Sequence, residues 1–521
     1  MGNKTSKVYE TLKGLKLRVI LESIIIGVGA GFVISLYRLI LDYLDGYTKA
    51  AYAFMDANKI YIILGIIVLA IMGYIVGRLV ENDGMISGSG IPQVEGILTG
   101  YFEVSPVRIL ITKFIGGVIA IGGGLSLGIE GPSIQLGASV GQIISKLFKR
   151  IKLEERFLLT SGAGAGLSAA FNAPLAGAMF AMEEVHKNFS PIILLSAIAA
   201  AVSSDLVTWI FFGSKPILDT HALSVIPFED YALLIALGII LGFAGAFYNL
   251  VLLKTQDLYK KIKAKLRYRM MIPFMFALVF GLTMPQILGG GNDLINNILV
   301  NGMAIKVAIM LLVFKFIFSM ISFSSDSPGG ILFPLLTLGA LVGVAFGDIS
   351  VTYFGLSQGL LMNFILIAMA GMFSSIVRAP LTGLILVCEM SGNFSQLGAV
   401  AVVCGVAFLV ADLIGSKPIY ESLLERRIKA NTGMIVGDGS EKVLVKYIVH
   451  LGTPIVGKKL KDIKLPNGAL MVSVERSGSD IIPNGNTMIR AGDYVVAIVS
   501  EDKEANLRTY LEKLCEKEDV D

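Results

Sequence analysis

The sequence predicts an all-α polytopic membrane domain made of two repeats with broken helices, followed by a small α+β domain. Three observations predict it. Of the 521 residues, 54% are hydrophobic and 16% are charged, whereas soluble proteins carry about a quarter charged residues. A long-range repeat divides the apolar part into two halves, and the character of the sequence changes near Asn431.

Ten apolar runs follow a basic N-terminal stretch. Some approach the roughly twenty residues that a helix needs to cross a bilayer, and others are shorter or interrupted. The shorter runs predict half-helices that end inside the protein. The runs cover residues 19–44, 60–80, 107–128, 191–212, 232–253, 271–288, 304–323, 332–346, 360–374 and 400–414.

The distribution of Lys and Arg predicts the orientation. Basic clusters lie at residues 146–156, 254–269 and 417–429, and the basic residues 1–17 lack the features of a cleaved signal peptide. The positive-inside rule therefore predicts a multi-pass protein of the plasma or inner membrane with both termini in the cytoplasm. The loops at residues 219–230 and 289–297 are poor in Lys and Arg and are expected outside.

The repeat is the strongest architectural feature. Gly128–Gly141 (GIEGPSIQLGASVG) and Gly330–Gly343 (GILFPLLTLGALVG) lie 202 residues apart and are identical at eight of fourteen positions, where about one match is expected by chance. A second pair, residues 173–183 and 379–389, aligns Glu183 with Glu389. Many transporters place their substrate site between two such halves.

Glu130 lies at a break between two apolar segments. An ionisable residue at membrane depth is costly and is therefore a functional candidate. Gly131-Pro132 suits the start of a helix, whose free N–H groups and positive dipole end attract anions. A carboxylate and an anion would compete for that position. Leu332 stands at the equivalent place in the second repeat.

Two further motifs add hydroxyl groups. Gly88-Ser89-Gly90-Ile91-Pro92 opens another helix that starts with a proline, and Lys417-Pro418-Ile419-Tyr420 follows the last apolar run. Helix N-termini together with a serine and a tyrosine hydroxyl form an anion site without Lys or Arg. Such a site suits rapid passage, because a full positive charge would hold the anion too tightly.

Taken in order, these motifs resemble the CLC family of chloride channels and chloride/proton exchangers, over residues 17–427. The resemblance implies two inverted repeats in each protomer of a homodimer, with one pore per subunit. It implies that Ser89 and Tyr420 bind chloride through hydroxyls, that Ile331 and Leu332 bind it through backbone N–H groups, and that Glu130 is the gate. The supporting motif residues are Gly88, Gly90, Pro92, Gly128, Gly131, Pro132, Gly330 and Pro334.

One motif departs from the family pattern. The family usually has GxFxP, whereas this chain has leucine at the aromatic position, Leu332. The backbone donors survive this change, so the resemblance still implies anion binding. Phe333 is one place along and is not assumed to substitute.

The pair Glu183-Glu184 bears on whether the protein is an exchanger or a channel. In the exchangers that it resembles, the second glutamate of such a pair accepts protons from the cytoplasm, which assigns that role to Glu184. The alternative is that both glutamates cap a helix end or pair with Lys187. Because Glu183 aligns with Glu389 and Glu184 aligns with Met390, Glu183 is expected to be structural and Glu184 to be the proton acceptor.

The predicted domains are a membrane domain at 1–430, a linker at 431–440 and a cytoplasmic domain at 441–521. Strands are expected at 443–449, 470–476, 480–483 and 494–499, and a helix at 500–517. Residues 441–517 resemble an RCK C-terminal domain, some of which bind cyclic di-AMP between subunits. That implies a regulatory ligand near Ile455, Ile482 and Arg490; the alternative is a dimerising domain without a ligand.

The sequence argues against an enzyme. Cys388, Cys404 and Cys515 have no metal-binding spacing, and no nucleophile elbow or phosphate loop occurs. No metal, cofactor or nucleic acid is expected.

The expected partners are chloride, protons, the lipid bilayer and a second copy of the chain. The predicted function is chloride/proton antiport regulated by the C-terminal domain; a passive gated chloride channel is the alternative. A receptor whose membrane part only anchors the soluble domain would not need intramembrane carboxylates, so the sequence argues against that class as well.

Overall fold

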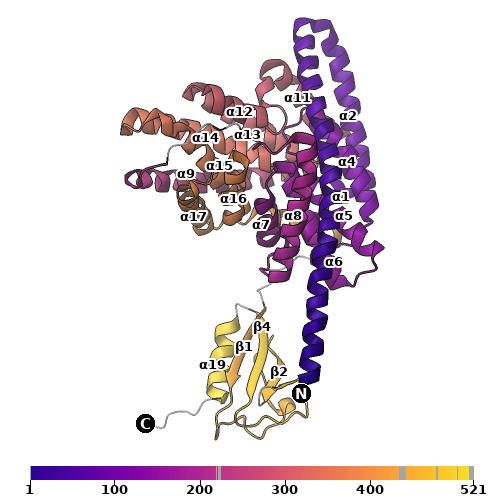
Figure 1. Ribbon diagram of the computed structural model, residues 1–521, viewed down its shortest axis with the longest axis vertical. Helices are drawn as coiled ribbons and strands as arrows, with labels where there is room; N and C mark the ends of the chain where they lie inside the picture. Colours follow the sequence, from indigo (N-terminus) through magenta and orange to yellow (C-terminus); the bar gives the residue numbers. More distant parts are fainter. Residues whose placement is uncertain are drawn as a thin grey trace. The chain divides into compact units, whose positions relative to one another are not determined.

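The computed structural model describes residues 2–218, 220, 225–432, 442–476, 479–500 and 503–515. The chain divides into two compact units between Arg426 and Arg427. Figure 1 shows the first as an assembly of helices and the second as a small sheet with one helix. Residues 433–440 of the expected linker, and 219 and 221–224 of an expected outer loop, lie outside the described residues.

Helices form the whole framework of the first unit. Eight helical segments in the described part of the chain are long and apolar enough to cross a membrane, and two shorter apolar helices accompany them. The first half comprises α1 (Gly2–Ala57), α2 (Ile62–Asn82), α3 (Ile91–Leu98), α4 (Pro106–Gly122), α5 (Glu130–Leu147), α6 (Lys152–Phe171), α7 (Pro174–Phe180) and α8 (Pro191–Phe212). The second comprises α9 (Tyr231–Lys261), α10 (Leu266–Arg269), α11 (Met271–Thr283), α12 (Asn292–Asn301), α13 (Ile305–Ser324), α14 (Leu332–Phe354), α15 (Leu361–Val377), α16 (Pro380–Ser391), α17 (Leu397–Leu413) and α18 (Ile419–Thr432).

Two expected helices end earlier than their apolar runs. The run at 107–128 continues past the end of α4 at Gly122, and Gly124 has φ +87°, a left-handed conformation that favours glycine. The run at 271–288 continues past the end of α11 at Thr283, where Pro285 cannot donate a helical hydrogen bond. Hydropathy alone does not detect either end, because most residues that follow the helix in each run are apolar as well.

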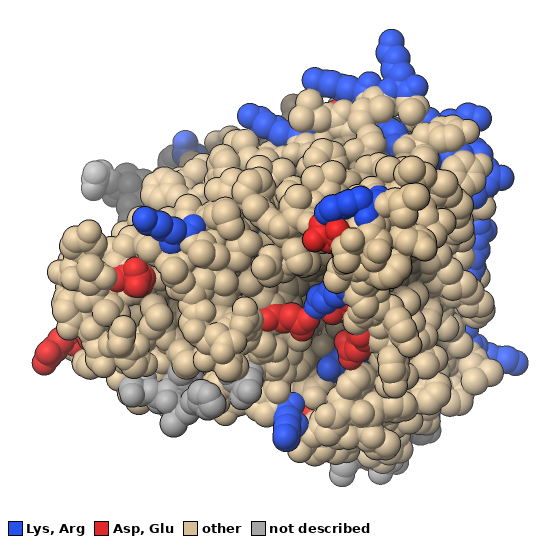
Figure 2. Space-filling model, turned by 90° about the horizontal axis from the view of Figure 1, so that it is seen from above, with Lys and Arg blue, Asp and Glu red and all other residues tan. Residues whose placement is uncertain are grey.

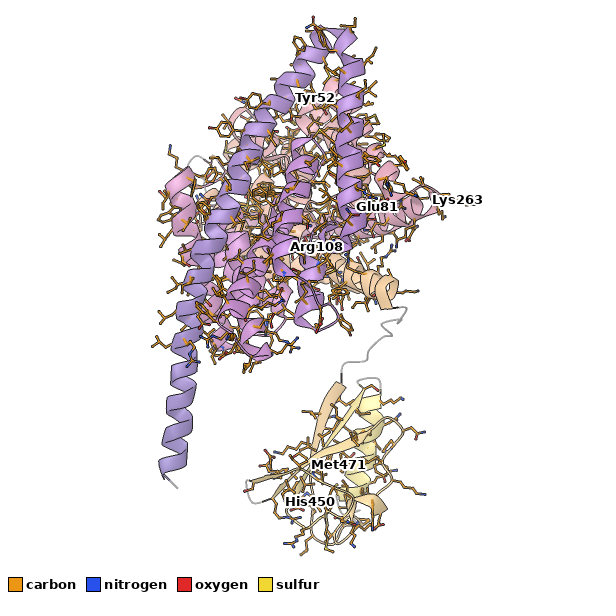
Figure 3. The ribbon with its side chains drawn as sticks, turned by 90° about the vertical axis from the view of Figure 1, so that its right-hand side faces the viewer. Tyr52, Glu81, Arg108, Lys263, His450 and Met471 are labelled. Carbon is orange, nitrogen blue, oxygen red and sulfur yellow. The ribbon has the colours of Figure 1, made fainter. Side chains whose placement is uncertain are left out.

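Glycine allows the membrane helices to pack closely. A Cβ atom added at Gly137 on α5 would lie 2.2 Å from the carbonyl oxygen of Gly162 on α6, and one added at Gly162 would lie 2.2 Å from that of Gly137. Backbone contacts of this kind are typical of packed membrane helices. Ion pairs occur at the polar helix ends, as between Glu81 in the last turn of α2 and Arg267 on α10 (2.9 Å). Figure 3 labels Glu81.

The second unit is an antiparallel sheet in the order β1-β4-β2-β3. The helix after β4 packs against β1 and β4, and its Leu507 and Leu511 enter a core that contains Val445 and Val495. The expected strands agree closely except the third, which ends before Pro483. The bounds are β1 Lys442–Ile448, β2 Leu470–Arg476, β3 Ser479–Ile481, β4 Tyr494–Ser500 and α19 Glu504–Cys515; Met471 of β2 is labelled in Figure 3.

Candidate functional site

The two repeats meet at their equivalent glycines. The N–H of Gly128 donates to the carbonyl of Gly330 at 2.8 Å, and the N–H of Gly330 donates back at 2.7 Å, as in an antiparallel bridge. A Cβ atom at Gly128 would lie 2.0 Å from a carboxylate oxygen of Glu130, and one at Gly330 would lie 2.2 Å from the other. A side chain at either position would therefore displace the carboxylate, which fills the space between them.

The Glu130 carboxylate lies at the N-terminus of the opposite repeat's helix. Glu130 is the first residue of α5, and its Oε1 accepts hydrogen bonds from the N–H groups of Leu332 (2.5 Å) and Phe333 (3.3 Å) at the start of α14. The side chain is fully buried, and Oε2 has no hydrogen-bond partner in the described part of the chain. A negative group thus occupies a helix N-terminus that would equally suit a free anion.

The N–H groups that bind Glu130 overlap in part with those predicted to bind chloride. The sequence resemblance predicted N–H groups of Ile331 and Leu332. The structure directs those of Leu332 and Phe333 at Glu130, while Ile331 is the N-cap residue of α14. The ring of Phe333 packs against that of Phe171, with ring centres 5.0 Å apart.

Two buried hydroxyl groups belong to the same region. Ser89 precedes Gly90, the left-handed N-cap residue of α3, and a Cβ of Gly131 would come within 2.4 Å of its Oγ. Tyr420 lies in the first turn of α18, is fully buried and interacts with the Ser89 side chain. Neither hydroxyl makes a hydrogen bond of normal geometry among the described residues. A buried polar group without a partner costs about 1–3 kcal/mol, so a bound acceptor such as an anion would stabilise the arrangement.

Two buried lysines hold the loops that precede α3 and α12. Lys113 Nζ donates to the carbonyls of Ile86 (2.9 Å) and Gly88 (2.6 Å), just before Ser89. Lys315, 202 residues later, donates in the same way to two carbonyls before α12, at 2.9 and 2.7 Å. The sequence analysis missed both, although a lysine inside an apolar run is a detectable signal.

Two tyrosines near Glu130 were also missed. Tyr37 on α1 and Tyr248 on α9 are fully buried, and their hydroxyls have no hydrogen-bond partner in the described chain. Both interact electrostatically with Glu130. No sequence signal distinguishes them, because tyrosine within an apolar run is more often an ordinary packing residue.

Glu183 and Glu389 have the shared structural role that their alignment predicted. Glu183 accepts hydrogen bonds from Leu381 N–H (3.1 Å) and from the N–H and hydroxyl of Thr382 (2.7 Å each) at the start of α16. Glu389 accepts bonds from two N–H groups at the start of α7, at 3.0 and 2.7 Å. Each repeat therefore caps a helix of the other.

Glu184 takes no part in this capping. It lies on a π-helical turn, Ala181–His186, and is 4% exposed. Its carboxyl group contacts that of Glu95 on α3. Lys187 pairs with Glu95, at 3.8 Å. π-Helical turns occur frequently at functional sites.

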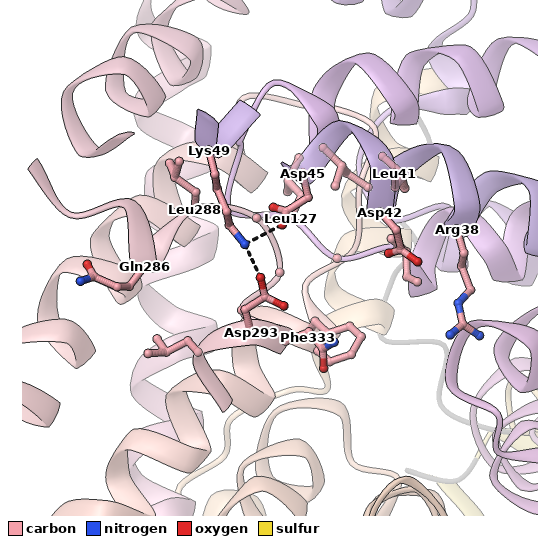
Figure 4. Close-up of a pocket in the computed structure, with 18 of the residues that line it drawn as sticks. Arg38, Leu41, Asp42, Asp45, Lys49, Leu127, Gln286, Leu288, Asp293 and Phe333 are labelled. Atoms are coloured by element: carbon pink, nitrogen blue, oxygen red, sulfur yellow. Dashed lines mark hydrogen bonds and ion pairs between the residues drawn. The ribbon is translucent and has the colours of Figure 1, made fainter. Parts of the chain in front are cut away.

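A cavity of about 760 Å³ leads toward the glycine bridge. Figure 2 shows acidic and basic side chains gathered around a hollow in one face of the molecule. In Figure 4, Lys49 lies between Asp45 (2.5 Å) and Asp293, so the ion pair joins α1 to α12. The lining includes Gly128, Ile129, Phe333, Arg38, Asp42, Asp45, Lys49 and Asp293.

The three suggested ligand residues of the second unit differ in accessibility. Ile482 is 91% exposed and Arg490 is exposed. Ile455 is fully buried in the core with Val474 and Leu507. Its side chain is not available to a ligand, contrary to the expectation, because the apolar side chain helps to form the core.

Comparison with known proteins gives two family matches. The family model described as voltage gated chloride channel matches residues 68–412, and the TrkA-C domain model matches residues 444–512. The H(+)/Cl(-) exchange transporter ClcA of Salmonella arizonae is 35% identical over 367 residues, covering 69% of this chain and 77% of that protein. The ClcA of Salmonella paratyphi B gives the same values.

Solved structures share the fold. The crystal structure of a slow cyanobacterial Cl-/H+ antiporter has a TM-score of 0.76 and 26% identity, and the match covers 80% of this chain and 99% of that one. A CLC-type fluoride/proton antiporter has a TM-score of 0.64 and 24% identity, over 78% of this chain and 97% of that one. The second likeness concerns the fold alone.

Proposed function

Because the chain belongs to the voltage-gated chloride channel family, we propose that it exchanges chloride for protons across a cell membrane. In this proposal Glu130 is the gate and Glu184 is the internal proton acceptor. The relatives are H(+)/Cl(-) exchange transporters and the structural neighbour is a Cl-/H+ antiporter, which supports antiport.

The observation that carries the proposal is the position of Glu130. Its carboxylate accepts hydrogen bonds from N–H groups at the N-terminus of α14, in a fully buried site. The buried hydroxyls of Ser89 and Tyr420, which lack a well-formed hydrogen bond in the described chain, lie in the same region. These groups are hydrogen-bond donors, and none carries a full positive charge, so an anion can bind there and leave.

Protonation would couple the gate to the anion. The ionised carboxylate competes with chloride for the N–H groups of α14, whereas the neutral acid has lost the charge that holds it there. Once Glu130 is protonated and moves away, chloride binds to the hydroxyls of Ser89 and Tyr420 and to the backbone N–H groups of Ile331 and Leu332. When Glu130 gives up its proton, the ionised carboxylate returns to the N–H groups of α14 and the anion leaves.

Glu184 is the second proton site in this proposal. The structural alternative assigned both members of Glu183-Glu184 to capping or to pairing with Lys187. Glu183 caps α16, whereas Glu184 contacts another buried carboxyl group and is not used as a cap. A buried carboxyl pair is a natural place to hold a proton.

Opposed gradients in liposomes test antiport against a passive chloride channel. The purified protein is reconstituted with a chloride gradient and a pH electrode outside. An exchanger drives protons uphill in the direction opposite to chloride, and a proton carrier added afterwards reverses that movement. Chloride flux that moves no protons at any pH would establish the channel and overturn antiport.

The remaining assignments rest on resemblance and family membership. We infer a homodimer in the plasma or inner membrane with both termini in the cytoplasm, which cross-linking in vesicles and cysteine accessibility would test. The TrkA-C match supports a regulatory second unit. Calorimetry of residues 427–521 with cyclic di-AMP, with ATP as the comparison, tests ligand binding; the absence of binding heat with both nucleotides would favour a dimerising domain.

A further inference from the structure

Glu95 and Glu184 form a buried carboxyl pair. Glu95 lies on α3 and Glu184 on the π-helical turn after α7, and their carboxyl groups are in contact. They are 3% and 4% exposed, and neither oxygen of Glu95 accepts a hydrogen bond from an N–H or hydroxyl group in the described chain. Two contacting carboxylates removed from water cannot both ionise, so a proton is held between them.

Lys187 connects this pair to water. It ends the π-helical turn in the left-handed region, with φ 53°. Its Nζ lies 3.8 Å from Glu95 Oε2, and its side chain is 46% exposed whereas that of Glu95 is 4% exposed. The ammonium group thus lies at the boundary between solvent and the buried pair.

Several other charged groups face the same region. Glu183 is on the same turn, but its carboxylate is bound to the start of α16. Glu421 on α18 is exposed and interacts electrostatically with Glu95 and Lys187. His186 is within hydrogen-bond distance of the Thr160 hydroxyl (3.0 Å). Arg156 on α6 interacts electrostatically with His186.

We propose that Lys187 is a positioning residue that stabilises the singly protonated Glu95–Glu184 pair and so sets the cytoplasmic pH range of proton exchange. This inference rests on the proposed function. One proton on the pair leaves a single negative charge, which the ammonium group balances. A second proton would leave the ammonium charge uncompensated, so Lys187 opposes double protonation.

The test compares Lys187→Met with Lys187→Arg in liposomes. Proton-coupled chloride flux is measured over a series of pH values on the side that Lys187 faces, assigned by its accessibility. Loss of the positive charge strengthens proton binding by the pair, so the Met variant shifts the pH profile upward by about half a unit. The Arg variant keeps the wild-type profile. Lys152→Met, in an ion pair with Glu103 that is 86% and 91% exposed, is the control for net charge.

A Glu95→Gln background shows whether Lys187 acts through the pair. The shift caused by Lys187→Met should shrink there, because interacting residues give non-additive effects. A full shift in that background, or a Met profile that superposes on wild type, overturns the inference. If Glu95→Gln does not fold, the Met and Arg comparison decides alone. Wild-type protein that moves chloride but no protons would instead overturn the proposed function.

Discussion

Glu183 and Glu389 make reciprocal contacts between the two repeats. Each carboxylate accepts hydrogen bonds from backbone N–H groups at the start of a helix in the other half. The same exchange of contacts recurs at Gly128 and Gly330. Glu130 and Glu184 lie beside these two symmetric contacts, at positions where the second repeat has Leu332 and Met390. The candidate proton groups are therefore additions to a symmetric framework.

Glu130→Gln should abolish proton coupling while chloride flux continues. Glutamine keeps the size of the side chain but does not exchange a proton at neutral pH. Parallel recordings of chloride efflux and proton uptake in liposomes check this. Proton transport that persisted in the variant would show that Glu130 is not the gate.

Glu184→Gln should retain chloride flux and lose most proton transport. Glu184 is buried against Glu95 but does not contribute to the capping bonds, so the anion site should remain intact. The same paired recordings apply, with thermal stability as the check on folding. A variant that still moved protons would return Glu184 to a structural role.

Gly330→Ala should displace Glu130 from the start of α14. The added Cβ would lie 2.2 Å from Glu130 Oε1 and 2.9 Å from Gly131 N, closer than side chains normally approach. We expect at least a tenfold change in transport rate, which corresponds to about 1.4 kcal/mol. Gly405→Ala, which meets nothing within 4 Å, is the matched control; equal rates in the two variants would contradict the steric argument.

Glu389→Gln should lower stability while leaving proton coupling intact. The carboxylate accepts hydrogen bonds from two N–H groups of α7, and loss of a helix cap costs about 1 kcal/mol. The thermal midpoint in detergent should therefore fall below that of the wild type. Loss of coupling in a well-folded variant would instead assign Glu389 to the proton route.

The second unit should lose stability in acid through Asp493. Burial favours the neutral acid, but hydrogen bonds from Arg476 and from the Arg490 N–H outweigh it and lower the pKa of Asp493 below its usual value. The contribution to stability is therefore full above the ordinary carboxyl pKa of about 4 and is lost as the pH falls below it. The measurement is urea unfolding of residues 427–521 at pH 7 and pH 3. This unit can be tested alone because it has a separate hydrophobic core.

Asp493→Asn should cost about 1–3 kcal/mol at pH 7 and reduce the acid dependence. Asp480→Asn is the control, because Asp480 is exposed and its carboxylate accepts a hydrogen bond from the Ser473 hydroxyl at 3.3 Å. If Asp493→Asn left the stability at pH 7 unchanged, the ion pair between Asp493 and Arg476 would contribute nothing net.

The sequence by itself determined the membrane class, the repeat, the helix starts near Pro92 and Pro132, and the small sheet that follows. Each depends on local composition, on proline and glycine, or on an alignment within one chain. The contacts of Glu183 and Glu389, the Glu95–Glu184 pair and the lysines that hold loops depended on the tertiary structure. These contacts join segments distant in sequence, so only the packing of one half against the other could decide them.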